Sequence, residues 1–277
     1  GLHGAIAYGE QRRQFNASSP EREEVLLDYQ NHQRRLIDRL ARAYADAFSS
    51  NELAVKFDDV FSGRADTDVD RQELETLAAA VKPLTTWNAL DTLQEAREAC
   101  GGMGFMARNR VTQMRADLDI FVTFEGDNNV LLQLVGKRLL TDYSKEFGRL
   151  EVGAVSRYVV LQASDALHRA GLPKVVQTVA DAGSERRSAN WFKDPAVQRE
   201  LLEDRVRAKT ADIAGTLSGA RGKGKAAQAD AFNTRQHELV EAARNHAELL
   251  QWEAFTRAVE AVEDETTATV LTWLRDL

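Results

Sequence analysis

Apolar side chains recur every three or four positions along most of this chain, a spacing that places them on one face of an α-helix. The clearest stripe lies between Leu26 and Phe48. Because Ser19 precedes Pro20 and acidic residues follow, we expect that helix to begin there and to run to about Phe48. Other helices are predicted at 1–15, at Leu53–Phe61 after a break at 49–51, from Asp66–Asp70 to Cys100 with a kink or restart at Pro83, and from Val130 to about Tyr143.

The second half of the chain shows the same helical spacing. Helices are predicted near 151–170, up to about Leu217, over 232–262, and over 270–277 with a start at Asp264 or Thr266. Loops are expected at 184–195 and 219–225. The fold class that follows is all-α.

Composition narrows the classes of function. The chain has 277 residues, of which 43% are hydrophobic, enough to fill the core of one large or two ordinary domains. The formal charge is −7 without long blocks of one sign, so no nucleic-acid surface is indicated. No apolar run reaches the roughly twenty residues of a membrane span. No histidine has a partner at metal-binding spacing, and the single cysteine, Cys100, is interpreted as a packing residue.

The most informative stretch surrounds Glu125. Mostly apolar strings precede and follow this carboxylate, so we expect it to be partly buried, with a raised pKa suited to a base. A loop or capping carboxylate is the alternative. Asp127 with Asn128 has the residue types of a cap for the following helix. Upstream, GGMG at 101–104 ends a helix and can let the backbone approach a ligand closely, although the motif taken alone favours a helix end with a tight loop.

Four motifs resemble the C-terminal helical region of acyl-CoA oxidases, within the acyl-CoA dehydrogenase superfamily. They are RRQF at 12–15, EAREACGGMGF at 95–105, RADLD at 115–119 and FEGDNNVLLQ at 124–133. The resemblance implies a helical bundle of the acyl-CoA dehydrogenase C-terminal type at 1–145, followed by a second helical domain at 146–277. It also implies that a whole subunit has an N-terminal helical domain and a β-domain before this region, and that FAD lies between these three parts. Because the chain lacks an initiator Met and starts within a helical pattern, we expect it to be part of a longer polypeptide.

The resemblance also assigns residues. Glu125 matches the family's catalytic base, and Phe124 and Gly126 beside it match substrate-facing positions. The expected contacts to FAD, several of them across a homodimer or higher homo-oligomer, are Arg12, Phe15, Glu98, Gly101, Gly102, Asp127 and Asn129. Met103 and Asn129 differ from the oxidases' usual His and Thr.

The function implied by the resemblance is oxidation of fatty acyl-CoA to trans-2-enoyl-CoA with oxygen as acceptor, in fatty acid β-oxidation. The location implied is peroxisomal in a eukaryote and cytoplasmic in a bacterium. Two alternatives stay open: a dehydrogenase that passes electrons to an electron-transfer flavoprotein, and a helical dimerisation or cofactor-binding module. We expect the chain by itself to be inactive.

Overall fold

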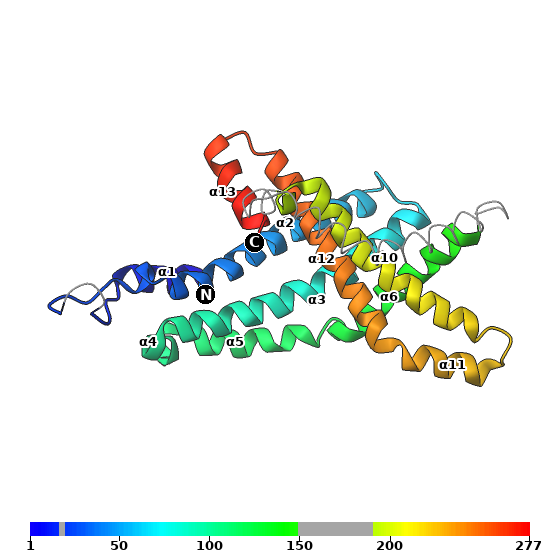
Figure 1. Ribbon diagram of the computed structural model, residues 1–277, viewed down its shortest axis with the longest axis horizontal. Helices are drawn as coiled ribbons and strands as arrows, with labels where there is room; N and C mark the ends of the chain where they lie inside the picture. The colour runs from blue at the N-terminus through cyan, green and yellow to red at the C-terminus, as the bar shows by residue number, and fades with distance from the viewer. Residues whose placement is uncertain (17–19, 149–190) are drawn as a thin grey trace, which may run out of the picture. The chain divides into compact units, whose positions relative to one another are not determined.

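A computed structural model describes residues 1–16, 20–148 and 191–277, which form helices joined by short loops (Figure 1). Within these ranges there is no strand, and Arg13 and Val25 form an isolated antiparallel bridge. The prediction of an all-α fold is therefore confirmed. The predicted helix near 151–170 lies outside the described residues, as does Ser19.

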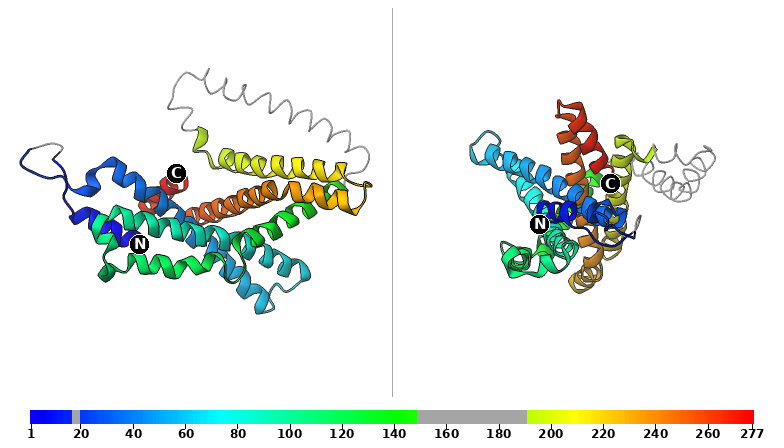
Figure 2. Two further views of the ribbon diagram at one scale, coloured as in Figure 1. Left: turned by 90° about the horizontal axis from the view of Figure 1, so that it is seen from below. Right: turned by 90° about the vertical axis from the view of Figure 1, so that its left-hand side faces the viewer.

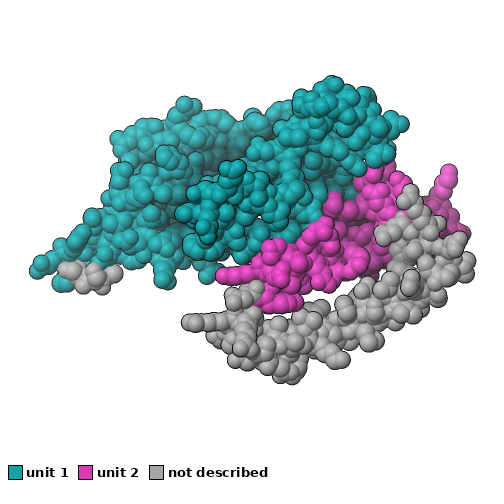
Figure 3. Space-filling model, turned by 90° about the horizontal axis from the view of Figure 1, so that it is seen from above, with its two compact units in different colours: residues 1–135, 247–277 teal, residues 136–246 magenta. Residues whose placement is uncertain are grey.

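The described chain forms two compact units (Figure 3). One consists of residues 1–135 and 247–277, and the other of residues 136–246. The C-terminal residues belong to the first unit because Phe255, Leu271 and Leu274 pack against Ala41. The predicted division into domains at 145/146 stays a prediction. The two compact units divide the chain at 135/136 and at 246/247.

The first unit is built on two long antiparallel-packed helices, α2 and α3. Its elements are α1 (Leu2–Gln11), η1 (Leu26–Asp28), α2 (Gln30–Phe61), α3 (Asp68–Ala99), α4 (Gly101–Phe105), η2 (Ala107–Asn109), α5 (Val111–Asp119), η3 (Ile120–Val122), the first part of α6 (Asn128–Gly148), the last part of α12 (Gln236–Glu260), and α13 (Glu265–Arg275). Helix α5 turns back and packs along α3 (Figure 2).

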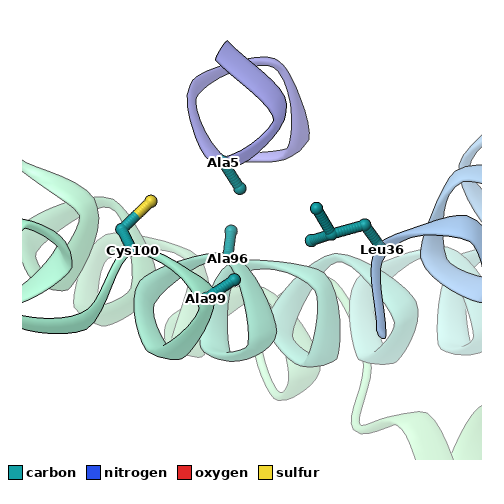
Figure 4. Close-up of a cluster of buried hydrophobic side chains, with 5 residues drawn as sticks. All are labelled: Ala5, Leu36, Ala96, Ala99 and Cys100. Carbon is teal, nitrogen blue, oxygen red and sulfur yellow. The ribbon is translucent and has the colours of Figure 1, made fainter. Parts of the chain in front are cut away.

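Ion pairs and small side chains hold α1 and α2 on α3. Ala5 of α1 and Leu36 of α2 meet Ala96, Ala99 and Cys100 at the end of α3 (Figure 4). Burial raises the pKa of the Cys100 thiol, which agrees with its interpretation as a packing residue. Further along α2, a ladder of arginine–carboxylate pairs faces α3: Arg35 to Glu95, and Arg39 and Arg42 to Asp91.

Two boundaries predicted for α2 are wrong. The helix begins at Gln30 instead of 19–20, because backbone groups of residues 12–15 pair with those of residues 24–26. The first helix likewise ends at Gln11 instead of Phe15. Helix α2 also continues through the expected break at 49–51. The Ser49 hydroxyl donates to the carbonyl of Ala45, so its hydrogen bond stays within the helix.

Helix α3 agrees better with its prediction. Thr67 and Asp70 form a capping box at its start, and the helix passes Pro83 without ending. It stops before the glycine run, where α4 begins at Gly101. Gly104 is the position that needs glycine for space, because an added Cβ would lie 2.0 Å from the Arg97 carbonyl oxygen.

The second unit contains the rest of α6, α10 (Pro195–Gly219), α11 (Lys225–Thr234) and the first part of α12. Its core gathers Ile213, Leu239 and Ala242, with Leu140 and Leu217 packed against them. The predicted loop at 219–225 is confirmed, and Asp194 caps α10. The single helix predicted over 232–262 is instead interrupted at Arg235, between α11 and α12.

Candidate functional site

Glu125 lies in the turn that joins η3 to α6. Its backbone is left-handed, with φ of 59°, and Gly126 follows with φ of 109°. A non-glycine residue rarely adopts positive φ, and such positions concentrate at functional sites where the surroundings enforce them. One contact to this turn comes from α3: the Lys82 ammonium donates to the Gly126 carbonyl oxygen at 2.6 Å.

Asn128, the first residue of α6, ties the same turn to α3. It is 1% exposed. Its Oδ1 accepts from Lys82 Nζ at 2.8 Å, and its Nδ2 donates to Thr86 Oγ1 at 3.0 Å and to the Pro83 carbonyl at 3.5 Å. A buried amide with partners on both atoms fixes its own orientation.

Asp127 caps α6, which confirms its predicted capping role. Its Oδ1 accepts from the backbone N–H groups of Asn129 at 2.9 Å and Val130 at 3.3 Å. Asn128 does not share that role, because its side chain points into α3. The side chains of Asp127 and Asn129 are exposed, and their predicted contacts to a cofactor stay predictions.

The expected burial of Glu125 is wrong for this chain, where its side chain is exposed. The apolar strings beside it do not form its cover, since Ile120 is 62% exposed, Val130 59% and Phe124 43%. The reason is that the turn lies on the outside of α3 and α5, so these side chains also face outward. A carboxylate rimmed by exposed apolar side chains is typical of a binding surface that another segment or ligand covers.

The charges around the turn are mixed. Partial burial lowers the pKa of the Lys82 ammonium, while the nearby carboxylates of Asp127 and Glu125 oppose that shift. The backbone N–H of Glu125, an exposed residue, donates to no acceptor within the described ranges.

Arg12 and Phe15 lie at the start of a loop between α1 and η1. Backbone bonds cross this loop, from Leu26 N–H to the Arg12 carbonyl and from Glu24 N–H to the Phe15 carbonyl. Phe15 has φ of 64°, is 64% exposed, and contacts Tyr29 edge to face. The Arg12 guanidinium is exposed and has no ion-pair partner in the part of the chain that the structure describes.

Glu98, Gly101 and Gly102 lie together where α3 meets α4. Gly101 and Gly102 are exposed, and an added Cβ on either would meet nothing within 4 Å. Glu98 is already engaged: a hydrogen bond from Gln94 holds its pKa below the usual range, helped by Arg97 and Arg35. Its ion pairs to Arg97 and Arg35 span 3.3 and 3.7 Å.

The predicted residues form two groups at two places along α3, apart from Arg12 and Phe15, which lie in the loop between α1 and η1. The turn of Glu125 is bound to Lys82, and Glu98 comes sixteen residues later on the same helix. At about 1.5 Å per residue, this places the two groups about 24 Å apart along the axis of α3.

Sequence reasoning missed Lys82 and Thr86. Both look like ordinary polar positions on a long helix, and their partners are more than forty residues away. No pattern in the sequence marks them, since Pro83 leaves the carbonyl of Ala79 without its helical partner and does not affect the side chain of Lys82 or Thr86.

Other features of the described residues do not coincide with these groups. A groove of about 650 Å³ runs along the first half of α2 beside Leu277 and is lined by none of the predicted site residues. No cluster of three or more potential metal ligands occurs in residues 1–16, 20–148 and 191–277. In the same ranges, no helix combines the length and apolar character that a membrane crossing requires.

Comparison with known proteins places these features in a family. Residues 2–140 match the model of the acyl-CoA oxidase C-alpha1 domain, and residues 194–277 match the model of the acyl-CoA oxidase family. The mouse acyl-coenzyme A oxidase-like protein is 34% identical over 261 residues, 94% of this chain and 39% of the relative. The peroxisomal acyl-coenzyme A oxidase 3 of Arabidopsis thaliana is 41% identical over 143 residues, 52% of this chain and 20% of that protein.

Solved structures agree. An acyl-CoA oxidase from tomato superposes with a TM-score of 0.78 at 26% identity, covering 99% of this chain and 39% of that one. Another is acyl-CoA oxidase-2 of Caenorhabditis elegans, bound with FAD, ascaroside-CoA and ATP. Its TM-score is 0.72 at 25% identity, and the match covers 99% of this chain and 38% of the oxidase chain. The chain thus spans about two fifths of these relatives at most. With the C-alpha1 model matching half of its length, the chain belongs to the acyl-CoA oxidase family.

Proposed function

We propose that this chain is the C-terminal part of an FAD-dependent acyl-CoA oxidase that converts fatty acyl-CoA and oxygen to trans-2-enoyl-CoA and hydrogen peroxide. In this reaction the carboxylate of Glu125 removes the proton from the α-carbon of the thioester. FAD, when bound, accepts the β-hydrogen as hydride and passes the electrons to oxygen. A carboxylate held in one geometry near a substrate carbon is what general-base catalysis requires.

The observation that carries this proposal is the anchored turn at Glu125. Lys82 and Asn128 hold the left-handed backbone of Glu125 and Gly126 in place, so the carboxylate is presented outward from a rigid helix pair. The open backbone N–H of Glu125 is available to a thioester oxygen, where it would stabilise the charge that develops as the proton leaves.

The exposure of Glu125 fits this proposal only if another part of the protein covers it. The relatives are more than twice as long as this chain, and we propose that their additional segments have counterparts that enclose the turn. Phe124 and Gly126, both exposed, would then face the acyl thioester. Enclosure would exclude water from the carboxylate and strengthen its interaction with the thioester.

The residues proposed for FAD suit an anionic dinucleotide. Arg12 offers an exposed guanidinium for the diphosphate, and Phe15 an exposed ring for the adenine. Gly101 and Gly102 leave their backbone open on one side. Asp127 and Asn129 are proposed to meet the cofactor near the base, and the ion pairs of Glu98 offset its charge beside the phosphates.

We also propose a homodimer, which the separation of the two groups along α3 supports. The Arg12 loop and the glycines are proposed to hold the FAD of a neighbouring copy, while Glu125 serves the copy's own FAD. The distance of about 24 Å along α3 between Glu98 and the Glu125 turn supports two half-sites instead of one. Four of the relatives carry the word peroxisomal in their names, and we propose that location here in preference to a bacterial cytoplasm.

The dehydrogenase alternative differs in the electron acceptor, and the assembly-module alternative in the absence of turnover. The test is to purify the longest form of the protein that its gene encodes and to assay palmitoyl-CoA in air for peroxide and enoyl-CoA. We expect equal amounts of both products. Enoyl-CoA formed only with an electron-transfer flavoprotein would contradict the oxidase, and bound flavin without any turnover would favour the assembly module.

A further inference from the structure

A closed ring of hydrogen bonds joins α3 to the turn that carries Glu125. Lys82 Nζ donates to Asn128 Oδ1, and Asn128 Nδ2 donates to Thr86 Oγ1 at 3.0 Å. The Thr86 hydroxyl in turn donates to the backbone carbonyl of Lys82 at 2.9 Å. Each donor in this ring faces an acceptor, so the ring has one consistent orientation and resists rearrangement.

The ring reaches the backbone of the turn at one atom, the carbonyl oxygen of Gly126. The Lys82 ammonium, which has three donors, uses one on this oxygen and one on Asn128. Gly126 has φ of 109°, a conformation that glycine can leave easily, and Glu125 has φ of 59°, which is unfavourable for a residue with a side chain. The turn therefore needs an outside contact to keep its shape.

We propose that Lys82 is a positioning residue for the base: it fixes the Gly126 carbonyl and thereby holds the left-handed backbone that presents Glu125. Lys82 acts through Glu125 and does not itself touch the reacting carbon. The Asn128–Thr86 pair holds the ammonium in its place. This inference rests on the proposed function of Glu125, and it predicts that Lys82 affects turnover only when Glu125 is present as the base.

The test compares Lys82→Met with Lys56→Met in the longest flavin-bound form of the protein. Lys56 is a matched control, because it also links two helices of the first unit, through Glu73 at 2.6 Å, and is absent from the proposed site. We expect Lys82→Met to lower kcat about tenfold with KM changed less than about twofold, since the base is misplaced and not removed. Lys56→Met should leave both values unchanged.

A double variant separates positioning from general damage. In a Glu125→Gln background, Lys82→Met should cause no further loss of flavin reduction, because the group that Lys82 positions is already gone. An equal loss in both backgrounds would overturn the inference and indicate a general structural role. If Lys82→Met fails to fold, Thr86→Val removes the hydroxyl at nearly constant shape, and it should lower kcat about threefold in the same Glu125-dependent way. Unchanged kcat in a folded Lys82→Met or Thr86→Val protein would overturn it as well.

Hydrogen exchange distinguishes failure of this inference from failure of the proposed function. Lys82→Met should speed amide exchange at least about tenfold at Phe124 and Asn129, the hydrogen-bonded amides on either side of the turn, and Lys56→Met should not, whatever the reaction is. Unchanged exchange there would show that Lys82 does not hold the turn. Normal flavin reduction in Glu125→Gln alone would instead refute the base assignment and leave the exchange result standing.

Discussion

Two of the predicted site residues, Phe15 and Glu125, share a left-handed backbone, but the chain holds them in different ways. The Glu125 turn is bound to the side chains of Lys82 and, through Asn128, Thr86 on a packed helix. The loop of Phe15 is held mainly by backbone bonds across itself and by the edge of Tyr29.

This difference separates two tasks. A base must be held within a fraction of an ångström of its working position, and side chains rooted in a helix can provide that. A loop that binds the cofactor of a neighbouring copy can change its conformation when the cofactor binds. The two regions should therefore respond differently to mutation, the turn through stability and turnover, and the loop through cofactor affinity.

The largest effect on stability is expected from Asn128→Leu in the anchored turn. The variant removes the hydrogen bonds to Thr86 and Pro83 and leaves the Lys82 ammonium with one acceptor fewer, so the free energy of unfolding should fall by about 2–4 kcal/mol. Urea unfolding measures the change. The neighbouring Asn129→Leu, at an exposed position, should change it by less than about 0.5 kcal/mol. Equal effects at the two positions would erase the distinction between anchored and exposed residues.

A smaller effect, on affinity only, is expected from Arg12→Ala in the loop. Loss of one charged contact to the diphosphate should weaken FAD binding about tenfold, which corresponds to about 1.4 kcal/mol, with no measurable change in unfolding. Flavin fluorescence during dialysis of the longest form of the protein gives the affinity. Arg22→Ala, an exposed arginine in the same loop, is the matched control and should bind FAD normally. Equal weakening by both variants would mean that net charge, and not the position of Arg12, matters.

The smallest effect is expected in the pH dependence of stability, through His32 beside the end of α1. His32 is buried against Gly9 at the end of α1, and desolvation, aided by Arg35, lowers its pKa below 6.5, while Glu95 opposes the shift. A histidine whose pKa is lowered by folding stabilises the folded state above its unfolded pKa, and that stability is lost as pH falls from about 6.5 toward the folded pKa. Unfolding free energies measured from pH 7.5 to 5.5 should therefore decline. His32→Gln should flatten the decline, and His3→Gln, at an exposed position, should not.

Helical spacing was enough to predict an all-α chain, the start of α3 at 66–70, its end at the glycine run and the cap by Asp127. It failed where polar groups found partners nearby in space: residues 12–15 pair with residues 24–26, and Ser49 bonds back into its own helix. Such pairings satisfy the backbone without changing the periodicity of the sequence.

The candidate site, like the fold, could be predicted only in part from the sequence. The motifs named the residues of the Glu125 turn and the glycines of α4, but the burial expected for Glu125 was wrong, because apolar neighbours in sequence lie exposed beside it. Lys82 and Thr86 escaped notice because their partners are remote in sequence and their helix positions carry no pattern of their own.

Whether Glu125 is the base can be tested by anaerobic reduction of the bound flavin with palmitoyl-CoA. The rate of reduction is followed by rapid-mixing absorbance in the longest form of the protein, with and without the substitution Glu125→Gln. The account predicts that the variant keeps its flavin and that the rate of reduction falls by about 10²–10⁴-fold, the range expected for loss of a general base. The control Asp119→Asn, an exposed carboxylate at the end of α5, should reduce at the normal rate. Reduction of the Glu125→Gln flavin at the normal rate would contradict the account.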